Sequence, residues 1–258
     1  MGELSGHAAI VSGAGRGIGA AIARRFAREG ASLVLAARTE AEIARLADEF
    51  APLGGGAVAV PVDVSDERSV RECVDACADT FGGVDILVNN AGAQYISPVA
   101  LSETERWIED FRVNIFGAYF FSKACLPHLA RSRNGQIVNI SSRMGKSPAA
   151  LNSAYCASKA ALNAFTVSLA AEAARDGIRV NAVCPGYVET KLLSDSIAAA
   201  SRVTGRTPED VKRLLAEKSM LRRAVTPEEV AEVVYFLVTR ATGMTGQAIN
   251  VTGGAETH

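Results

Sequence analysis

The sequence lacks the features that would direct a chain to a membrane, a nucleic acid or a secretory route. No apolar run approaches the ~20 residues that are needed to span a bilayer. The N-terminus has no basic segment followed by an apolar core, which a secretion signal would need. Basic and acidic residues nearly balance, with a formal net charge of −1. We therefore predict a cytoplasmic protein with no membrane partner and no nucleic-acid partner.

Cysteine and histidine are too few and too scattered to indicate a disulfide framework, a metal site or a catalytic triad. The five cysteines are odd in number and show no CxxC spacing, which favours reduced and mostly buried side chains. Cys73 and Cys77 share one helix face, but no histidine or further cysteine follows nearby to complete a metal site. We predict that the protein binds no metal.

Short apolar runs alternate with helical patterns throughout the 258 residues, and neither a repeat nor a linker interrupts them. This alternation is typical of a doubly wound parallel sheet with helices on both faces, so we predict an α/β fold in a single domain over residues 1–258. The predicted strands are His7–Ser12, Ser32–Ala37, Ala57–Val62, Val84–Val88, Gln136–Ile140, Ile178–Val183 and Gln247–Val251. The predicted helices of the second half include Glu103–Asn114, about Phe116–Arg131, Ala154–Arg175 and Thr226–Thr239.

One segment departs from the alternation. Residues 189–223 are mostly helical in pattern and follow the carboxyl end of a predicted strand, where open α/β sheets bind ligands. We predict a helical substrate lid there. The alternative is a structural excursion that serves contacts between subunits.

A proton-transfer site is indicated by Ser142, Tyr155 and Lys159. Tyr155 and Lys159 are four residues apart, so on a helix they lie on one face. A nearby ammonium favours the phenolate and lowers the pKa of a tyrosine from its usual value of about 10. Ser142 closely follows a predicted strand, and its hydroxyl could hold a substrate oxygen. Tyr-x-x-x-Lys alone is weak evidence, because ordinary helices contain it by chance.

A glycine-rich turn follows the first predicted strand and opens a helix. The spacing is Gly13-x-x-x-Gly17-x-Gly19, with Gly15 in addition. Backbone N–H groups and the helix dipole at such a turn favour the pyrophosphate of a dinucleotide. The alternative is a plain tight turn.

Taken together, these motifs resemble the short-chain dehydrogenase/reductase family, in order and spacing over essentially the whole chain. The resemblance implies an NAD(P)-dependent oxidoreductase with a seven-stranded Rossmann sheet, usually a homotetramer. Ser12 departs slightly from the family pattern, which most often has threonine there. The matching positions are Ser12 to Gly19, Asp63-Val64, Asn89 to Gly92, Asn114, Ser142, Tyr155-x-x-x-Lys159 and Pro185-Gly186.

The resemblance also implies roles for individual residues. Tyr155 looks like the general acid/base, and Ser142 would hold and polarise the carbonyl oxygen. Lys159 would lower the pKa of the phenol and bind the nicotinamide ribose, while Asn114 would support a water linking Lys159 to solvent. The cofactor-binding residues implied are Gly13, Gly15, Arg16, Gly17, Ile18, Gly19, Arg38, Asp63, Val64, Asn89, Ala91, Gly92, Tyr155, Lys159, Pro185, Gly186, Val188 and Thr190.

The preferred cofactor is argued from charge. An acid at the end of the second strand would repel a 2′-phosphate, but Ala36 and Ala37 stand there. Arg38 follows, and Arg16 lies in the glycine turn, so two guanidinium groups could bind that phosphate. We predict NADP(H), with NAD(H) as the alternative if Arg38 only opens the next helix at the surface.

The substrate is the least defined part of the prediction. Gln94 matches a carboxylate-binding residue of 3-hydroxybutyrate dehydrogenases, but three other binders of that branch are replaced by Met144, Asn152 and Ser196. Arg143 is interpreted as a solvated side chain rather than an anion site. The candidate substrate residues form a larger, more apolar wall and are Gln94, Tyr95, Met144, Leu151, Asn152, Tyr187, Leu192 and Leu193.

We therefore predict a reductase of ketones, or dehydrogenase of secondary alcohols, that acts on a small molecule with NADP(H). The alternatives are an NAD-linked hydroxy-acid dehydrogenase and, in another class, a dinucleotide-binding regulator without turnover. The intact Ser142, Tyr155 and Lys159 argue against a regulator. Apolar residues on more than one side of Ala154–Arg175 and around Phe116–Phe121 also predict a homo-oligomer, most simply a tetramer.

Overall fold

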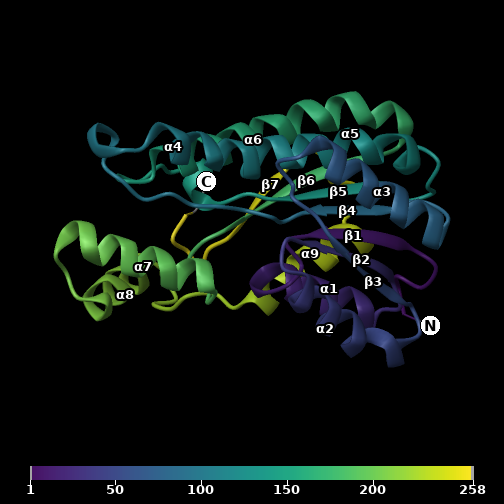
Figure 1. Ribbon diagram of the computed structural model, residues 1–258, viewed down its shortest axis with the longest axis horizontal. Helices are drawn as coiled ribbons and strands as arrows, with labels where there is room; N and C mark the ends of the chain where they lie inside the picture. Colours follow the sequence, from purple (N-terminus) through teal and green to yellow (C-terminus); the bar gives the residue numbers. More distant parts are fainter. Residues whose placement is uncertain (1, 257–258) are drawn as a thin grey trace.

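Seven parallel strands form one sheet at the centre of the molecule (Figure 1). The structure is a computed structural model that describes residues 2–256. The strand order is β3-β2-β1-β4-β5-β6-β7, so the direction of winding reverses between β1 and β4. This confirms the predicted doubly wound α/β fold. The strands are β1 (Ala8–Ser12), β2 (Ser32–Ala37), β3 (Ala57–Pro61), β4 (Ile86–Asn89), β5 (Gln136–Ile140), β6 (Arg179–Pro185) and β7 (Ala248–Val251).

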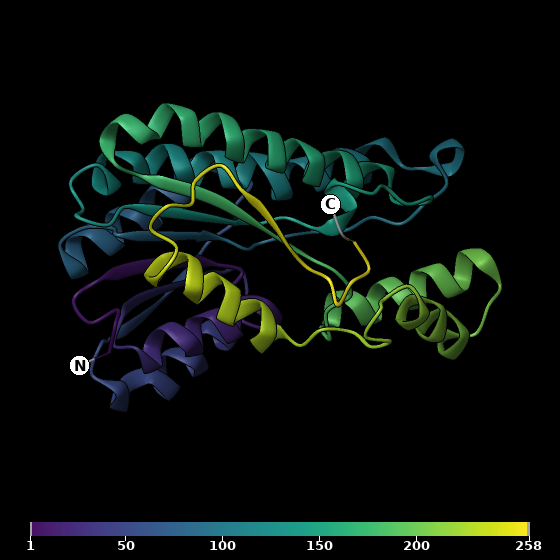
Figure 2. The ribbon, with the colours of Figure 1, turned by 180° about the vertical axis from the view of Figure 1, so that it is seen from behind.

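Helices cover both faces of the sheet, as Figures 1 and 2 show from opposite sides. Neighbouring strand residues point to opposite faces, so Val11 packs with one helix layer and Ile10 with the other. One layer contains α1 (Gly17–Arg28), α2 (Glu40–Phe50) and α9 (Pro227–Thr239). The other contains α3 (Glu67–Phe81), α5 (Gly117–Leu129) and α6 (Ser153–Ala173), with α4 (Thr104–Phe111) beside it.

The boundary between α4 and α5 differs from the prediction. Two separate helices were expected, but a π-helical segment, Arg112–Phe116, joins them without a break. Such segments insert one residue into a helical turn and often occur at functional sites. Asn114 lies in the middle of this segment and is buried.

The insertion after β6 forms two helices, α7 (Lys191–Thr204) and α8 (Pro208–Glu217), at the side of the molecule (Figure 1). Thr190 caps α7 and Thr207 caps α8 through bonds to Leu193 N and Asp210 N, respectively. Gly205 ends α7 with a φ of +72°, which a glycine adopts without strain. The helical pattern predicted for this segment is therefore present.

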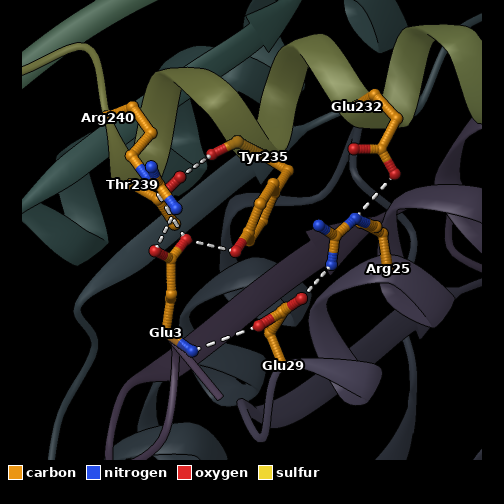
Figure 3. Close-up of polar contacts among 7 residues, drawn as sticks. All are labelled: Glu3, Arg25, Glu29, Glu232, Tyr235, Thr239 and Arg240. Carbon is orange, nitrogen blue, oxygen red and sulfur yellow. Dashed lines mark hydrogen bonds and ion pairs between the residues drawn. The ribbon is translucent and has the colours of Figure 1, made fainter.

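A polar network ties the N-terminal segment to α1 and α9 (Figure 3). The Glu3 carboxylate accepts hydrogen bonds from Tyr235 of α9 and from Arg240, which follows the end of that helix, and the Glu3 N–H donates to Glu29. Arg25 of α1 bridges Glu29 and Glu232. These bonds hold the edge of the helix layer together on the side remote from α7 and α8.

Several predicted absences can be examined over residues 2–256. All five cysteines are free and buried, as predicted. In this range no group of His, Cys, Asp or Glu is arranged to hold a metal ion. None of the helices described is long and apolar enough to cross a bilayer.

Candidate active site

A cavity of about 390 Å³ opens beyond the carboxyl ends of the strands, where the winding reverses. The β1–α1 turn, the segments after β4, β5 and β6, and helices α6, α7 and α8 form its wall. Residues far apart in the sequence therefore meet around one space.

The glycine turn forms one end of this cavity. Gly13 has a φ of +64°, and a Cβ there would come within 2.9 Å of Ala91 Cα. A Cβ on Gly19 would lie 2.2 Å from the Gly13 carbonyl oxygen. Asn90 fixes the turn by donating hydrogen bonds to the carbonyls of Ser12 and Gly13, at 2.9 and 3.1 Å. The turn is thus packed so closely that no side chain fits at positions 13 and 19. The helix N-terminus that it opens is a type of site that suits a pyrophosphate.

The structure brings Ser142, Tyr155 and Lys159 together in the cavity wall. Ser142 follows the end of β5, and its hydroxyl accepts a hydrogen bond from Met144 N at 3.1 Å. Tyr155 and Lys159 lie one turn apart on α6, with Lys159 Nζ 5.8 Å from the centre of the Tyr155 ring. Lys159 Nζ donates to the Ile140 carbonyl at 2.8 Å, which fixes the ammonium beside the end of β5.

Burial controls the protonation of both α6 residues. It raises the pKa of Tyr155 to about 12, although hydrogen bonding with Ser142 opposes the shift. Burial also lowers the pKa of Lys159 to about 8. Lys159 was expected to lower the pKa of Tyr155, but the effect of burial is larger, and the pKa of Tyr155 is raised instead. At neutral pH the phenol is protonated and the ammonium is mostly charged.

Asn114 supports this site without lining the cavity. Its Oδ1 accepts from Ala93 N at 2.9 Å, and its Nδ2 donates to the Ala93 carbonyl and to Ser158 Oγ. A Cβ on Gly92 would lie 3.3 Å from Asn114 Oδ1 and 3.8 Å from Lys159 Nζ. The π-helical turn thus aims Asn114 at the β4–α4 segment, next to Lys159.

Most of the predicted cofactor residues lie in the wall of the cavity. Asn89 and Gly19 do not, and Asn89 instead donates to Asn139 Oδ1 at 2.9 Å between β4 and β5. The predicted cofactor residues that line the cavity are Gly13, Gly15, Arg16, Gly17, Ile18, Arg38, Asp63, Val64, Ala91, Gly92, Tyr155, Lys159, Pro185, Gly186, Val188 and Thr190. The wall therefore brings together the residues that could hold a nicotinamide dinucleotide.

Glu42 was not predicted as a site residue, but it lies in the wall of the cavity near the glycine turn. A Cβ on Gly15 would be 2.6 Å from Glu42 Oε2, and Arg16 Nη1 lies 3.2 Å from Glu42 Oε1. Its place in the first turn of the helix after β2 could have indicated it, because that turn follows the end of β2. Glu42 and Arg16 therefore form an ion pair in the wall of the cavity.

A chain of hydrogen bonds crosses the substrate side of the cavity. Gln94 Nε2 donates to Asn152 Oδ1 at 2.7 Å, and Ser196 Oγ of α7 donates to Gln94 Oε1 at 2.7 Å. Two of the three positions that depart from the hydroxybutyrate branch, Asn152 and Ser196, therefore pair with Gln94. This chain joins α7 to the segments before α4 and α6.

Six of the eight predicted substrate residues line the cavity, and two do not. Tyr95 donates its N–H to Asp110 Oδ2 at 3.0 Å, and its hydroxyl accepts from Glu103 N, so it packs against α4. Leu151 is also outside the wall, with a φ of +68°. The six residues in the wall are Gln94, Met144, Asn152, Tyr187, Leu192 and Leu193. Apolar residues of the wall that the sequence analysis missed are Ile96, Ile197, Ala200, Val211 and Leu215.

The interpretation of Arg143 as a solvated side chain is wrong. Arg143 is only 8% exposed, and it lines the cavity. Its Nη2 donates to the Tyr187 hydroxyl, and its guanidinium carbon lies 4.6 Å from the centre of that ring. The residue begins a short 3-10 turn, Arg143–Gly145, which directs its side chain toward the segment after β6.

Known proteins resemble the chain along its whole length. The family model described as short chain dehydrogenase matches residues 7–200. The chain belongs to the short-chain dehydrogenase family. Oxidoreductase UcpA of Salmonella typhimurium is 42% identical over 260 residues, which cover 99% of this chain and 96% of that protein. D-beta-hydroxybutyrate dehydrogenase of Rhizobium meliloti is 34% identical over 250 residues, covering 95% of this chain and 97% of that protein.

A solved structure shares the fold of this short-chain dehydrogenase. NAD+-bound xylitol dehydrogenase superposes with a TM-score of 0.93 at 29% identity, covering 97% of this chain and 99% of that one. The protein is thus an oxidoreductase of a family that binds NAD(P), and its cavity offers the residues for such a cofactor.

Proposed function

We propose that the protein reduces a ketone, or oxidises the corresponding secondary alcohol, with NADP(H) as the preferred cofactor. The observation that carries this proposal is the meeting of Ser142, Tyr155 and Lys159 in one cavity wall, beyond the glycine turn. When bound, the nicotinamide cofactor supplies or accepts the hydride.

Tyr155 supplies the proton in the reducing direction. Because its pKa is about 12, the phenol carries its proton at neutral pH and can donate it to the carbonyl oxygen as that oxygen gains charge. The Ser142 hydroxyl donates a second hydrogen bond to the same oxygen. The Lys159 ammonium stabilises the phenolate that Tyr155 leaves behind.

Replacement of Tyr155 tests this role. Tyr155→Phe keeps the shape of the side chain and removes only the hydroxyl, so NADPH binding should be retained while turnover falls by roughly 10²- to 10⁴-fold. Fluorescence titration of NADPH and assay of a ketone panel at the nicotinamide absorbance measure the two properties. Tyr235→Phe removes a tyrosine hydroxyl outside the cavity and is the matched control. Substantial turnover by Tyr155→Phe contradicts the assignment.

The same assays separate the proposed function from a dinucleotide-binding regulator. A regulator would bind NADPH but would turn over no member of a broad panel of ketones and alcohols. The proposed reductase turns over at least one of them, and that activity depends on Tyr155.

The preference for NADP(H) rests on the charges at the far end of the cavity. Arg38 and Arg16 line this end, and β2 ends in Ala36 and Ala37 without a carboxylate. Glu42 holds Arg16, but their side chains are 31% and 61% exposed, and such surface pairs contribute only ~0–1 kcal/mol. A 2′-phosphate would therefore displace Glu42 from Arg16 at little cost.

Variants of this end of the cavity test the cofactor. Arg38→Met should weaken NADPH binding by about 10- to 100-fold and leave NADH binding nearly unchanged, because a hydrogen bond to a charged group is worth ~1.5–3 kcal/mol. Glu42→Gln should strengthen NADPH binding, since it releases Arg16. Arg45→Met removes an exposed charge of α2 outside the cavity and should affect neither cofactor. Tighter binding of NADH than NADPH by the unaltered protein would show that the preference is wrong.

A further inference from the structure

We propose that Arg143 is an anion-binding residue that selects substrates carrying a carboxylate. This inference rests on the proposed function, because it assigns a substrate class to the same cavity. The first observation is the lack of a counter-ion. Arg143 is 8% exposed, and among residues 2–256 no carboxylate forms an ion pair with it.

The guanidinium is only partly satisfied by the protein. Nη2 donates to the Tyr187 hydroxyl, whereas Nε is enclosed and has no hydrogen-bond partner among the described residues. Nη1 also donates to none of them. Leaving the enclosed Nε donor of a charged group without an acceptor is unfavourable, and a carboxylate in the adjoining cavity that bound the guanidinium would offset that penalty.

The charges around the cavity favour an anion at this end. Each carboxylate of the wall has a partner other than Arg143. Glu42 pairs with Arg16, Asp63 accepts from Ser65, and Asp195 pairs with Lys191.

Two further ammonium groups are those of Lys146, in the segment after β5, and Lys159, on α6. Lys146 Nζ donates to the Ala248 carbonyl at 2.7 Å, and Lys159 Nζ donates to the Ile140 carbonyl at 2.8 Å. Both bond to neutral carbonyl oxygens, and neither forms an ion pair with a carboxylate of residues 2–256. A planar guanidinium then offers a carboxylate two parallel donors.

The position of Arg143 suits substrate recognition rather than cofactor binding. It directly follows Ser142, which we assign to the carbonyl oxygen, and it contacts Tyr187, which the sequence predicted for the substrate wall. A substrate with its carbonyl at Ser142 and Tyr155 could extend its carboxylate toward Arg143. Oxo acids and their hydroxy-acid counterparts have this form.

Paired probes test the inference on the full-length protein. In pyruvate, acetoacetate and levulinate the carboxylate carbon lies one, two and three bonds from the ketone carbon, and each acid has a neutral methyl ester. We expect the unaltered protein to prefer at least one acid over its own ester by about tenfold or more in kcat/KM, as the loss of a charge-assisted hydrogen bond predicts.

Two variants assign that preference to Arg143. Arg143→Met should raise KM for the preferred acid by about 10- to 100-fold while changing kcat/KM for the ester by no more than about twofold. Arg143→Lys keeps the charge without the planar fork and should retain part of the preference. Arg68→Met removes an exposed charge of α3, and we expect it to leave both substrates unchanged.

The outcomes separate this inference from the proposed function. Reduction of ketones and esters without a preference for any acid overturns the anion site and leaves the reductase proposal standing. A preference for an acid that survives in Arg143→Met also overturns the assignment. No reduction of any carbonyl despite NADPH binding contradicts the proposed function itself. If Arg143→Met does not fold, the acid and ester comparison on the unaltered protein and on Arg143→Lys still decides.

Discussion

At the scale of single residues, burial sets the chemistry of this site more than sequence spacing does. Tyr155 and Lys159 are one helical turn apart, which predicts that the ammonium lowers the pKa of the phenol. Both groups are buried, however, and burial disfavours each charged form. The protein without ligands therefore holds a protonated acid rather than a phenolate base.

These shifts predict how ketone reduction depends on pH. Lys159 has a pKa of about 8, so its ammonium is present below that pH and is lost as the pH rises through it. Tyr155 stays protonated over the same range, because its pKa is about 12. We therefore expect kcat/KM for NADPH-dependent ketone reduction to be flat at neutral pH and to fall above about pH 8. Initial rates from pH 6 to 10 measure this profile, and a rate that rises through pH 9 contradicts the argument.

The titration of Lys159 would not by itself make unfolding the cause of such a fall. The pKa of Lys159 is lower in the folded protein than its usual value of 10.5, so the unfolded chain binds more protons between about pH 8 and 10.5. This group therefore makes the free energy of unfolding rise with pH across that window. Thermal melts at pH 7 and 9 are the control that separates a change in activity from a loss of fold.

At the scale of elements, the 3-10 turn after β5 is held closely against α6. A Cβ on Gly145 would lie 2.7 Å from the Lys159 carbonyl oxygen and 2.9 Å from Asn163 Nδ2. The close approach of this turn to α6 places Ser142 beside Tyr155. A side chain at position 145 would push the two elements apart.

Gly145→Ala should therefore damage both stability and turnover. Overpacking typically costs ~1–3 kcal/mol, which urea denaturation would measure as a lower free energy of unfolding. A displacement near 1 Å between Ser142 and Tyr155 would lower kcat by up to about 10²-fold. Gly243→Ala is the matched control, since no atom lies within 4 Å of a Cβ there. Equal behaviour of the two variants would show that the close contact does not position the site.

The elements themselves were largely predictable from the sequence, because hydrophobic periodicity depends on local pattern. The strands Ser32–Ala37 and Gln136–Ile140 have the predicted bounds at both ends. The π-helical turn at Asn114 was not predicted, since its extra residue depends on contacts with Ala93 and Ser158, far away in the sequence.

The site was predictable where a motif fixes it and was missed where tertiary packing decides. The glycine turn and the Ser142–Tyr155–Lys159 set were found from their spacing. The burial of Arg143 depends on Tyr187, 44 residues away, and the position of Glu42 depends on how α2 lies against the glycine turn. Tyr95 stands between two residues that line the cavity, Gln94 and Ile96. Its own side chain packs against α4, because Tyr95 forms hydrogen bonds with Asp110 and with Glu103 N. No local pattern carries this information.

At the scale of the whole molecule, the outer face of α5 and α6 carries apolar side chains that the chain does not cover. Tyr119 and Val167 are 43% and 54% exposed, and Phe116 at the start of α5 is 47% exposed. Tyr119 and Phe165 pack edge to face with their centres 6.4 Å apart, which joins the two helices into one surface. Exposed apolar surfaces of this kind mark interfaces, and most soluble oligomers are assemblies of identical chains.

We therefore expect a homo-oligomer that uses this face, with a light-scattering mass near four times the 27.0 kDa of the chain. Val167→Glu places a charge in the centre of the surface, and burying that charge without a partner is unfavourable, so the variant should dissociate. Leu101→Glu introduces the same charge at a side chain that is 77% exposed and belongs to the 3-10 turn Val99–Leu101 rather than to α5 or α6, so it should leave the mass unchanged. Dissociation by both variants would place the interface elsewhere, whereas a 27.0 kDa mass for the unaltered protein would show that the face stays uncovered in solution.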